Sequence, residues 1–157
     1  MRIALFSFLC IVGLTAPAQA RLGETADQLV ARYGQPLSET DQKGEAGKIP
    51  LANVIFEKGG FQVIVTLTNG VSVAESIHKL NGQPLTLTEI RTLLTVNSQG
   101  HGWEAPQMVQ GEKWWTRDDN ATAQLAQTGS LTIKSPVLLS EQAVAKKLES
   151  NPSLEGF

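Results

Sequence analysis

The stretch from Leu51 to Leu80 constrains the fold more than any other part of this sequence. Apolar and polar residues alternate on both sides of Gly59-Gly60, and a period of two is typical of antiparallel strands that are buried on one face. A two-residue turn at the paired glycines predicts a specific register. The resulting pairs are Lys58 with Phe61, Phe56 with Val63, Val54 with Val65 and Ala52 with Leu67. This register gathers the apolar side chains on one face, so we predict a hairpin with that face in the core.

The next turn contains Asn69-Gly70, and its length decides which face every later side chain occupies. A shift of one residue moves each side chain of a strand to the other face. A two-residue loop sets Leu67, Val65 and Val63 against Ser72, Ala74 and Ser76. A three-residue loop over residues 68–70 pairs Leu67 with Val71, Val65 with Val73, Val63 with Glu75 and Phe61 with Ile77. The second pairing keeps the apolar face more uniform, so we predict a type I turn with a G1 bulge and a left-handed Gly70. The opposite, mainly polar face then carries Gln62, Thr66, Ser72, Ser76 and His78.

Capping boxes predict two helices. Thr25 and Thr86 are each followed three residues later by a Gln or Glu, which is the pattern of a reciprocal cap at a helix start. The first helix covers residues 25–33 and ends at Gly34, and the second covers residues 86–97. Their apolar residues recur with helical spacing, so we expect both helices to cover the apolar face of the sheet.

The remaining segments complete a second helix-and-strands unit. Residues 38–50 are polar and contain Gly, which predicts a mobile surface loop. We expect strands at 113–117, 121–126 and 131–133, and a terminal helix over 140–149. The predicted fold class is therefore α+β, with a helix-plus-three-strand unit occurring twice. We expect an antiparallel sheet with helices mainly on one face, within a single domain over residues 21–157.

The first 20 residues have the pattern of a secretory signal peptide. A basic Arg2 precedes an apolar run from Ile3 to Leu14, and Ala18-Gln19-Ala20 is an A-x-A cleavage pattern. The run is too short to span about 30 Å of hydrocarbon as a helix. We therefore expect cleavage between Ala20 and Arg21, a periplasmic or secreted mature protein, and no membrane anchor after cleavage.

Composition excludes several classes of function. The chain has 13 Lys and Arg against 15 Asp and Glu, without the basic excess of a nucleic-acid binder. Cys10, the single Cys, lies in the leader, and Leu9 stands before it where a lipoprotein needs a small residue. Two His and no mature Cys leave no multi-ligand zinc site and no disulfide. Asp118-Asp119-Asn120 lacks the ligand spacing of a calcium loop and is more typical of a turn. We expect no metal and no cofactor.

A search for catalytic motifs leaves one weak candidate. His101 lies in a Gly-flanked loop close to Glu104 and Ser98 in the sequence. A general base needs a nucleophile within reach and an orienting carboxylate. His101 and Glu104 are therefore candidate catalytic residues of a small secreted hydrolase, and an exposed loop histidine is the alternative interpretation.

Adjacent tryptophans suggest a binding surface instead. Trp114 and Trp115 must point to opposite faces of their strand. A turn on Asp119-Asn120 sets Trp114 opposite Leu125 and leaves Trp115 on the outer face beside Arg117. An outer aromatic ring next to a guanidinium is typical of a binding platform, or of a stacked pair that protects the sheet. The candidate binding residues are Trp103, Trp115 and Arg117.

Residues 22–36 resemble the first helix of several small exported proteins. Leu22-Gly23-Glu24-Thr25, Val30 and Tyr33-Gly34-Gln35-Pro36 are similar to an L-G-x-[ST]…V…G-x-P pattern. The small lipoprotein of the outer-membrane β-barrel assembly machinery has such a helix, and β-lactamase inhibitor protein-like domains have a comparable helix-on-antiparallel-sheet architecture. The Trp115, Arg117, Asp119 and Asn120 hairpin also resembles one in uncharacterised secreted bacterial proteins. These resemblances imply a non-catalytic envelope protein that works through contacts.

The sequence thus leaves three hypotheses open. We favour an exported bacterial module that binds another envelope protein and no nucleic acid. A hydrolase that uses His101 is the second hypothesis, and a purely structural envelope component is the third. The oligomeric state is not readable from these patterns.

Overall fold

A computed structural model describes residues 21–42 and 51–150 of the 157-residue chain. In these two ranges the elements are α1 (Ala26–Tyr33), β1 (Ser38–Gln42), β2 (Leu51–Lys58), β3 (Phe61–Thr68), β4 (Val71–Lys79), α2 (Leu87–Val96), β5 (Gln107–Val109), β6 (Glu112–Thr116), β7 (Thr122–Leu125), β8 (Leu131–Lys134) and α3 (Pro136–Ser150). None of the helices within these ranges is both long and apolar enough to cross a membrane.

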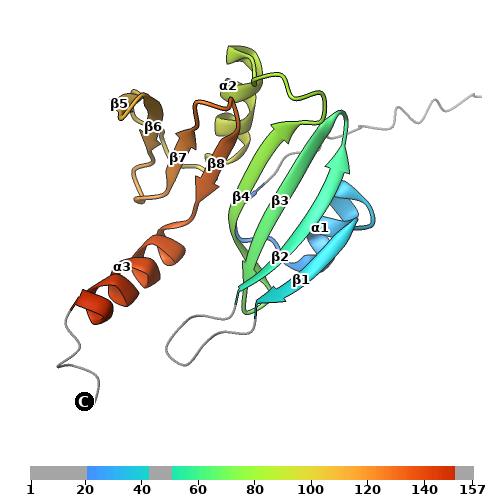
Figure 1. The fold of residues 1–157 in the computed structure, drawn as a ribbon, viewed down its shortest axis with the longest axis horizontal. Helices are drawn as coiled ribbons and strands as arrows, with labels where there is room; N and C mark the ends of the chain where they lie inside the picture. Colours follow the sequence, from blue (N-terminus) through green and yellow to red (C-terminus); the bar gives the residue numbers. More distant parts are fainter. Residues whose placement is uncertain (1–20, 43–50, 151–157) are drawn as a thin grey trace, which may run out of the picture.

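The strands form one antiparallel sheet in the order β1-β2-β3-β4-β8-β7-β6-β5 (Figure 1). Each half is a four-stranded meander preceded by a helix, and the last strands of the two meanders, β4 and β8, pair in the middle. The α+β class with an antiparallel sheet is as predicted. Each unit has four strands rather than three, because the edge strands β1 and β5 were missed.

Edge strands carry little of the pattern that reveals a central strand. β1 reads Ser-Glu-Thr-Asp-Gln, and β5 has only three residues, all of them exposed. Such strands are held by main-chain hydrogen bonds and bury no apolar face, so alternation is not required. The predicted surface loop is therefore wrong over residues 38–42, and residues 43–50 lie outside the described residues.

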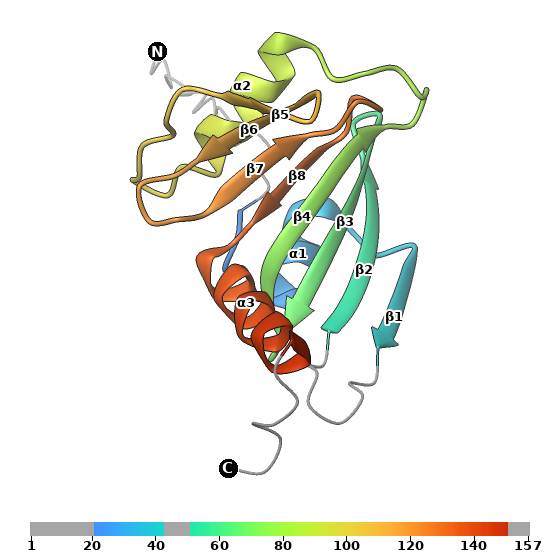
Figure 2. The same cartoon turned by 60° about the vertical axis from the view of Figure 1, so that its left-hand side comes forward.

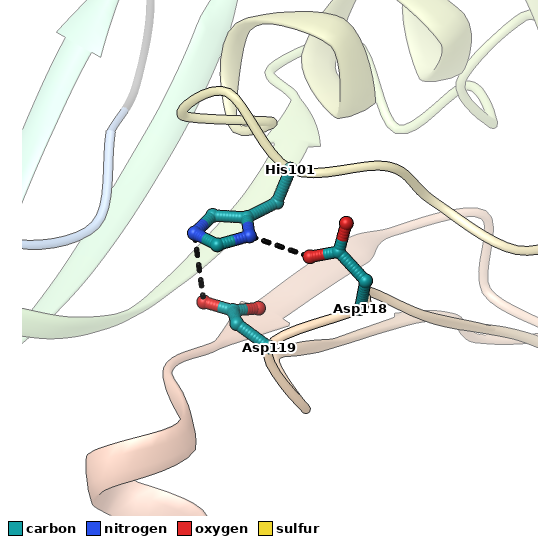
Figure 3. A group of neighbouring side chains, drawn as sticks. All are labelled: His101, Asp118 and Asp119. Atoms are coloured by element: carbon teal, nitrogen blue, oxygen red, sulfur yellow. Dashed lines mark hydrogen bonds and ion pairs between the residues drawn. The ribbon is translucent and has the colours of Figure 1, made fainter.

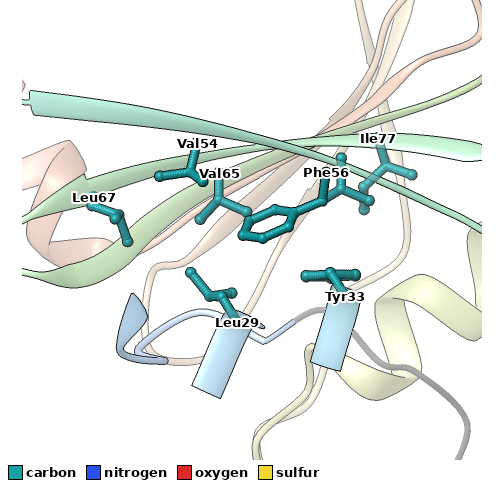
Figure 4. Packing of buried hydrophobic residues seen from close by; sticks show 8 residues of the cluster. Leu29, Tyr33, Val54, Phe56, Val65, Leu67 and Ile77 are labelled. Carbon is teal, nitrogen blue, oxygen red and sulfur yellow. The ribbon is translucent and has the colours of Figure 1, made fainter. Parts of the chain in front are cut away.

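Helices α1 and α2 cover one face of the sheet, and α3 lies against the other (Figure 2). On the first face, Leu29 and Tyr33 of α1 point into an apolar cluster formed by β2, β3 and β4 (Figure 4). The second cluster joins Ile90 and Leu94 of α2 to β6, β7 and β8. On the opposite face α3 makes a smaller contact, in which Leu138 packs against Val73 and Ala74.

Local signals placed the helix starts and the first hairpin correctly. Both predicted capping boxes are present, with Thr25 and Thr86 as N-caps. The β2–β3 register is the predicted one, from Lys58 with Phe61 to Ala52 with Leu67.

The β3–β4 turn is one residue shorter than predicted. Asn69 and Gly70 have φ values of 50° and 75°, which makes a two-residue turn with both residues left-handed. A register shift beside Thr66 and Leu67 then inserts an extra residue into β4. In the resulting pairing Val63 lies opposite Ile77, Val65 opposite Glu75 and Leu67 opposite Ser72. The predicted bulge is present but lies inside the ladder, and it brings Ser72 onto the buried face, where Glu75 was already expected.

The β6–β7 turn is one residue longer than predicted. The Arg117 N–H donates to the Ala121 carbonyl at 2.8 Å, and Asn120 is left-handed with φ 71°, so residues 118–120 form a three-residue loop. Trp115 therefore pairs with Ala123, and the two faces of β6 are exchanged relative to the prediction.

Helix α3 begins at Pro136, four residues before the predicted start. The Ser135 hydroxyl accepts a hydrogen bond from the Leu138 N–H at 3.2 Å and caps the helix. Proline is favoured at the first helical position because its missing N–H has no intrahelical partner there. Pro136 is therefore the first residue of the helix.

Candidate functional site on the open face of the sheet

The three predicted binding residues are parts of the fold rather than of an outer surface. Trp115 is only 9% exposed and packs in the cluster beneath α2. Trp103 is half-buried, and its indole N–H donates to the Leu94 carbonyl at 2.8 Å. The expectation that Trp115 and Arg117 lie on the outer face is wrong, because the three-residue β6–β7 loop turns both inward.

Arg117 joins the end of α2 to the β6–β7 turn. Its side chain is 2% exposed, and its guanidinium donates two hydrogen bonds of 2.7 Å to the Asp119 carboxylate. It also donates to the Asn97 carbonyl and lies 5.6 Å from the ring centre of Trp103. The Arg117 hydrogen bonds lower the pKa of Asp119 to about 2, aided by the Ala121 N–H. This arrangement is a buried structural clamp.

His101 lies at the edge of the same clamp and pairs with Asp118, not with Glu104 (Figure 3). Its Nδ1 is 2.5 Å from Asp118 Oδ1, and its Nε2 is 4.0 Å from Asp119 Oδ2. The Gly102 N–H donates to the other Asp118 oxygen, and this bond together with His101 lowers the pKa of Asp118. Glu104 is exposed, and its N–H donates to the Thr116 carbonyl.

Both nitrogens of the imidazole therefore face carboxylates. Within residues 21–42 and 51–150, no hydroxyl side chain hydrogen-bonds to the His101 ring, so the arrangement provides an orienting acid without a nucleophile. The ligand atoms of His101, Asp118 and Asp119 lie within 4.8 Å of one another, close enough to hold a cation. Both Asp119 oxygens already accept a hydrogen bond from Arg117, which uses part of their capacity to bind a cation.

The sheet face opposite α1 and α2, which we call the open face, contacts α3 near Val73 and Ala74 at one end of β4. One row of paired residues crosses all eight strands on this face. It runs Ser38, Ile55, Ile64, Ser76, Thr132, Gln124, Trp114 and Gln107. Its six central members are half-buried, while the end residues Ser38 and Gln107 are exposed. The row combines short hydroxyl and amide groups with three large apolar side chains.

Neighbouring side chains on the open face bond to one another across the strands. The Ser76 and Thr132 hydroxyls are 3.2 Å apart, and the Thr66 hydroxyl donates to the Asn53 amide oxygen at 2.9 Å. The Gln124 amide donates to the Glu112 carboxylate. These bonds hold the polar groups in place, so the surface is preorganised.

A polar hollow of about 320 Å³ opens beside this row. It is lined by Ser76, His78, Lys79, Gly82, Gln83, Thr128, Gly129 and Ser130. His78 belongs to β4 and keeps the predicted position on the polar face, next to Gln62. The hollow lies between the end of β4, the loop that follows β4 and the loop that follows β7.

Sequence reasoning missed Trp114 as a surface residue. A signal was present, because Asp118-Asp119-Asn120 supplies three turn-forming residues and Asn tolerates the left-handed position that a three-residue loop needs. Counting three loop residues instead of two would have placed Trp114 on the open face.

No family model and no curated protein matches this chain. Among solved structures it is similar to a cysteine-rich secretory protein from Staphylococcus aureus, with a TM-score of 0.42 and 14% identity. The similarity covers 76% of this chain and 46% of that protein, so the chain spans less than half of its length.

Proposed function

We propose that this chain is an exported bacterial protein that acts as a non-catalytic binding module and binds another protein of the cell envelope through the open face. The observation that carries the proposal is the row of partly exposed side chains that crosses the eight strands on the face beside α3. An antiparallel sheet is stable with one face packed and the other solvated, so the part of this face that α3 leaves open can serve a partner.

The chemistry of the open face suits a protein surface. Ser, Thr and Gln side chains both donate and accept hydrogen bonds, and Trp114, Ile55 and Ile64 add apolar area among them. Tryptophan is enriched among the residues that dominate protein interfaces. The charged side chains of the face are mixed in sign, with Glu57 on β2, Glu112 on β6 and Lys134 on β8, which argues against a nucleic-acid partner.

Trp114 is the residue on which this proposal concentrates. It is half-buried, and its indole N–H has no acceptor within the described residues. Buried Trp side chains usually find such an acceptor, so Trp114 stabilises the fold less than its size suggests. We infer that Trp114 contributes mainly to the binding of a partner.

Site-specific photo-crosslinking in bacteria tests the proposal. A photoreactive residue replaces Gln124 on the open face, and the control replaces Leu87, which is 63% exposed on the outside of α2. We expect a crosslinked envelope protein from Gln124 and none from Leu87. Binding of that purified protein should then weaken at least about tenfold in Trp114→Ala, the loss of one interface anchor. Equal crosslinking from both positions, or unchanged affinity of Trp114→Ala, would refute the site.

The hydrolase hypothesis rests on the contact between His101 and Asp118. Its weakness is that the second ring nitrogen faces Asp119 rather than a hydroxyl group. Any hydrolytic activity found with ester, amide and glycoside substrates should persist in His101→Ala. A loss of more than about a hundredfold, the scale of general-base catalysis, would favour the enzyme instead.

A further inference from the structure

Glu75 is a buried acid in the middle of the sheet. Its side chain is 0% exposed, and its strand neighbours are Val65 on β3 and Ile133 on β8. Among the described residues no hydrogen bond of good geometry reaches either carboxylate oxygen. A buried carboxylate without a partner is strongly unfavourable, so such a group either takes up a proton or pairs with a counter-charge.

The charged groups around Glu75 do not supply one. Arg32 on α1 lowers the pKa of Glu75, but its guanidinium is already bound to the Glu24 carboxylate. Glu24 itself raises the pKa, and the Tyr33 hydroxyl lies buried nearby without a partner. Asn97, after α2, contributes only a neutral amide. Burial is the largest effect and raises the pKa of Glu75 to about 8.

The chain just before α1 is held by hydrogen bonds to β4 and to the segment after α2. Leu22 is 3% exposed, and its N–H donates to the Asn97 side chain at 3.3 Å. The Gly23 N–H donates to the Ser72 carbonyl at 2.8 Å, and the Glu24 N–H donates to the Ser72 hydroxyl at 3.0 Å. The Gln99 amide donates to the Leu22 carbonyl. Residues 22–24 thus have a defined path across the seam between the two apolar clusters.

Arg21 is the residue that this path brings to Glu75. Its main-chain N–H faces the carboxylate and lowers the pKa of Glu75. Its main-chain carbonyl accepts a hydrogen bond from the Ser72 hydroxyl at 3.2 Å, which fixes the orientation of the residue. The bond between Ala20 and Arg21 is also the one at which we expect the leader to be cleaved.

We propose that cleavage before Arg21 creates an α-ammonium group that forms an ion pair with the buried Glu75 carboxylate and completes the core of the mature protein. Hydrolysis of the Ala20–Arg21 amide adds water across the bond, leaving a carboxylate on Ala20 and the ammonium on Arg21. A peptide N–H brings one donor and no charge, whereas the ammonium brings three donors and a positive charge to the same place. The α-amino group has an ordinary pKa near 8, so it is already largely protonated at neutral pH, and the pairing favours that form further.

The first test compares two forms of the protein. One begins at Arg21, and the other carries a single Gly before it, which moves the ammonium away by one residue. Each form is also made with Glu75→Gln, which keeps the shape of the side chain and removes its charge. At pH 7 we expect the Gly extension to lower Tm by about 10 °C, the scale of breaking a buried pair in a domain of this size. In the Glu75→Gln background the extension should change Tm by less than about 2 °C. Among proteins that retain Glu75, equal Tm values for the form that begins at Arg21 and the Gly-extended form would overturn the proposal.

The pH profile gives a second readout that a merely structural role would not move. In the extended form the folded-state pKa of Glu75, about 8, lies above its ordinary value of 4.5. The folded state then holds a proton that the unfolded state has lost. The contribution of Glu75 to the stability of the extended form is therefore fully present below pH 4.5 and is lost as pH rises toward and through 8. Between pH 4.5 and 8 we expect this decline in the extended form and its absence both in the form that begins at Arg21 and in Glu75→Gln; above pH 8 the form that begins at Arg21 should also lose stability, as its α-amino group loses its proton. Matching declines in all the forms would overturn the ion pair.

The inferred ion pair rests on the proposed export, and a separate measurement distinguishes a failure of the export proposal from a failure of the ion pair. The full chain is expressed with its leader, and the N-terminal residue of the periplasmic protein is sequenced. A start other than Arg21 refutes the cleavage site, while the comparison above, made on proteins built to begin at Arg21, tests the contact with Glu75 directly. The α-amine of the paired form should also react with acetylating reagent at least about tenfold more slowly than that of Glu75→Gln, because an ion-paired ammonium is not a nucleophile.

Discussion

Replacing Arg117 by Met tests whether the clamp at the β6–β7 turn is structural. Methionine keeps the unbranched length of the side chain but removes its charge and donors. The 2% exposed guanidinium donates to both Asp119 oxygens at 2.7 Å and to the Asn97 carbonyl. The substitution therefore separates the end of α2 from the turn and leaves Asp119 without its counter-charge.

The structure gives two estimates of the size of this effect. The pKa of Asp119 falls from 3.8 to about 2, and each unit corresponds to about 1.4 kcal/mol, so the hydrogen bonds and charges around Asp119, those of Arg117 foremost, are together worth roughly 2 kcal/mol. Removing one partner of a buried pair destabilises proteins by about 3–5 kcal/mol. The Asp119 side chain is 23% exposed, which favours the lower end of that range. We expect Arg117→Met to reduce the free energy of unfolding by about 3 kcal/mol.

Urea unfolding at several pH values measures the prediction. The pKa of Asp119 is lower in the folded state than in the unfolded state, so its contribution is present above pH 3.8 and is lost as pH falls through about 2. The wild type should lose this part of its stability in acid. Arg117→Met should show a smaller decline over the same pH range, because the interaction is already absent.

Arg117→Lys is the matched control. Lysine retains the charge but not the two parallel hydrogen bonds of the guanidinium. We therefore expect the unfolding free energy of Arg117→Lys to lie between those of the wild type and Arg117→Met. An unfolding free energy of Arg117→Met within 0.5 kcal/mol of the wild-type value would refute the structural clamp and would restore Arg117 as a candidate binding residue.

Two further pairs of variants test the assignment of faces and the packing of one loop. Trp115→Ala should lower the unfolding free energy by about 3–5 kcal/mol, because it empties a buried site, whereas Trp114→Ala should lower it by less than about 1 kcal/mol; the reverse order would exchange the two faces. Gly129 has φ +83°, and a Cβ there would lie 2.5 Å from the Pro84 Cα, so Gly129→Ala should cost more than about 2 kcal/mol in thermal unfolding. Gly82 has φ +71° with nothing within 4 Å, so Gly82→Ala should cost only about 1 kcal/mol; equal losses at both glycines would contradict the close contact.

The errors of sequence reasoning have one physical origin. Both mistaken hairpins were wrong by a single loop residue, in opposite directions: Asn69-Gly70 forms a shorter turn than predicted, and Asp118-Asp119-Asn120 a longer one. Either length suits these turn-forming residues locally. The actual length follows from contacts distant in the sequence, such as those of Arg117 with Asn97. Because a strand has a period of two, the error at the β6–β7 turn exchanged both faces of β6, whereas the bulge in β4 restored the predicted faces from Ala74 onward.

Features that depend on a few neighbouring residues were therefore determined by the sequence alone. The capping boxes at Thr25 and Thr86 and the β2–β3 register belong to this group, because their hydrogen bonds and side-chain pairs close within one turn or hairpin. The pairing of β4 with β8, the inward position of Trp115 and the burial of Glu75 were decided only by the tertiary structure. Each of these is set by packing across the whole sheet, which outweighs the small differences in local preference between alternative turns.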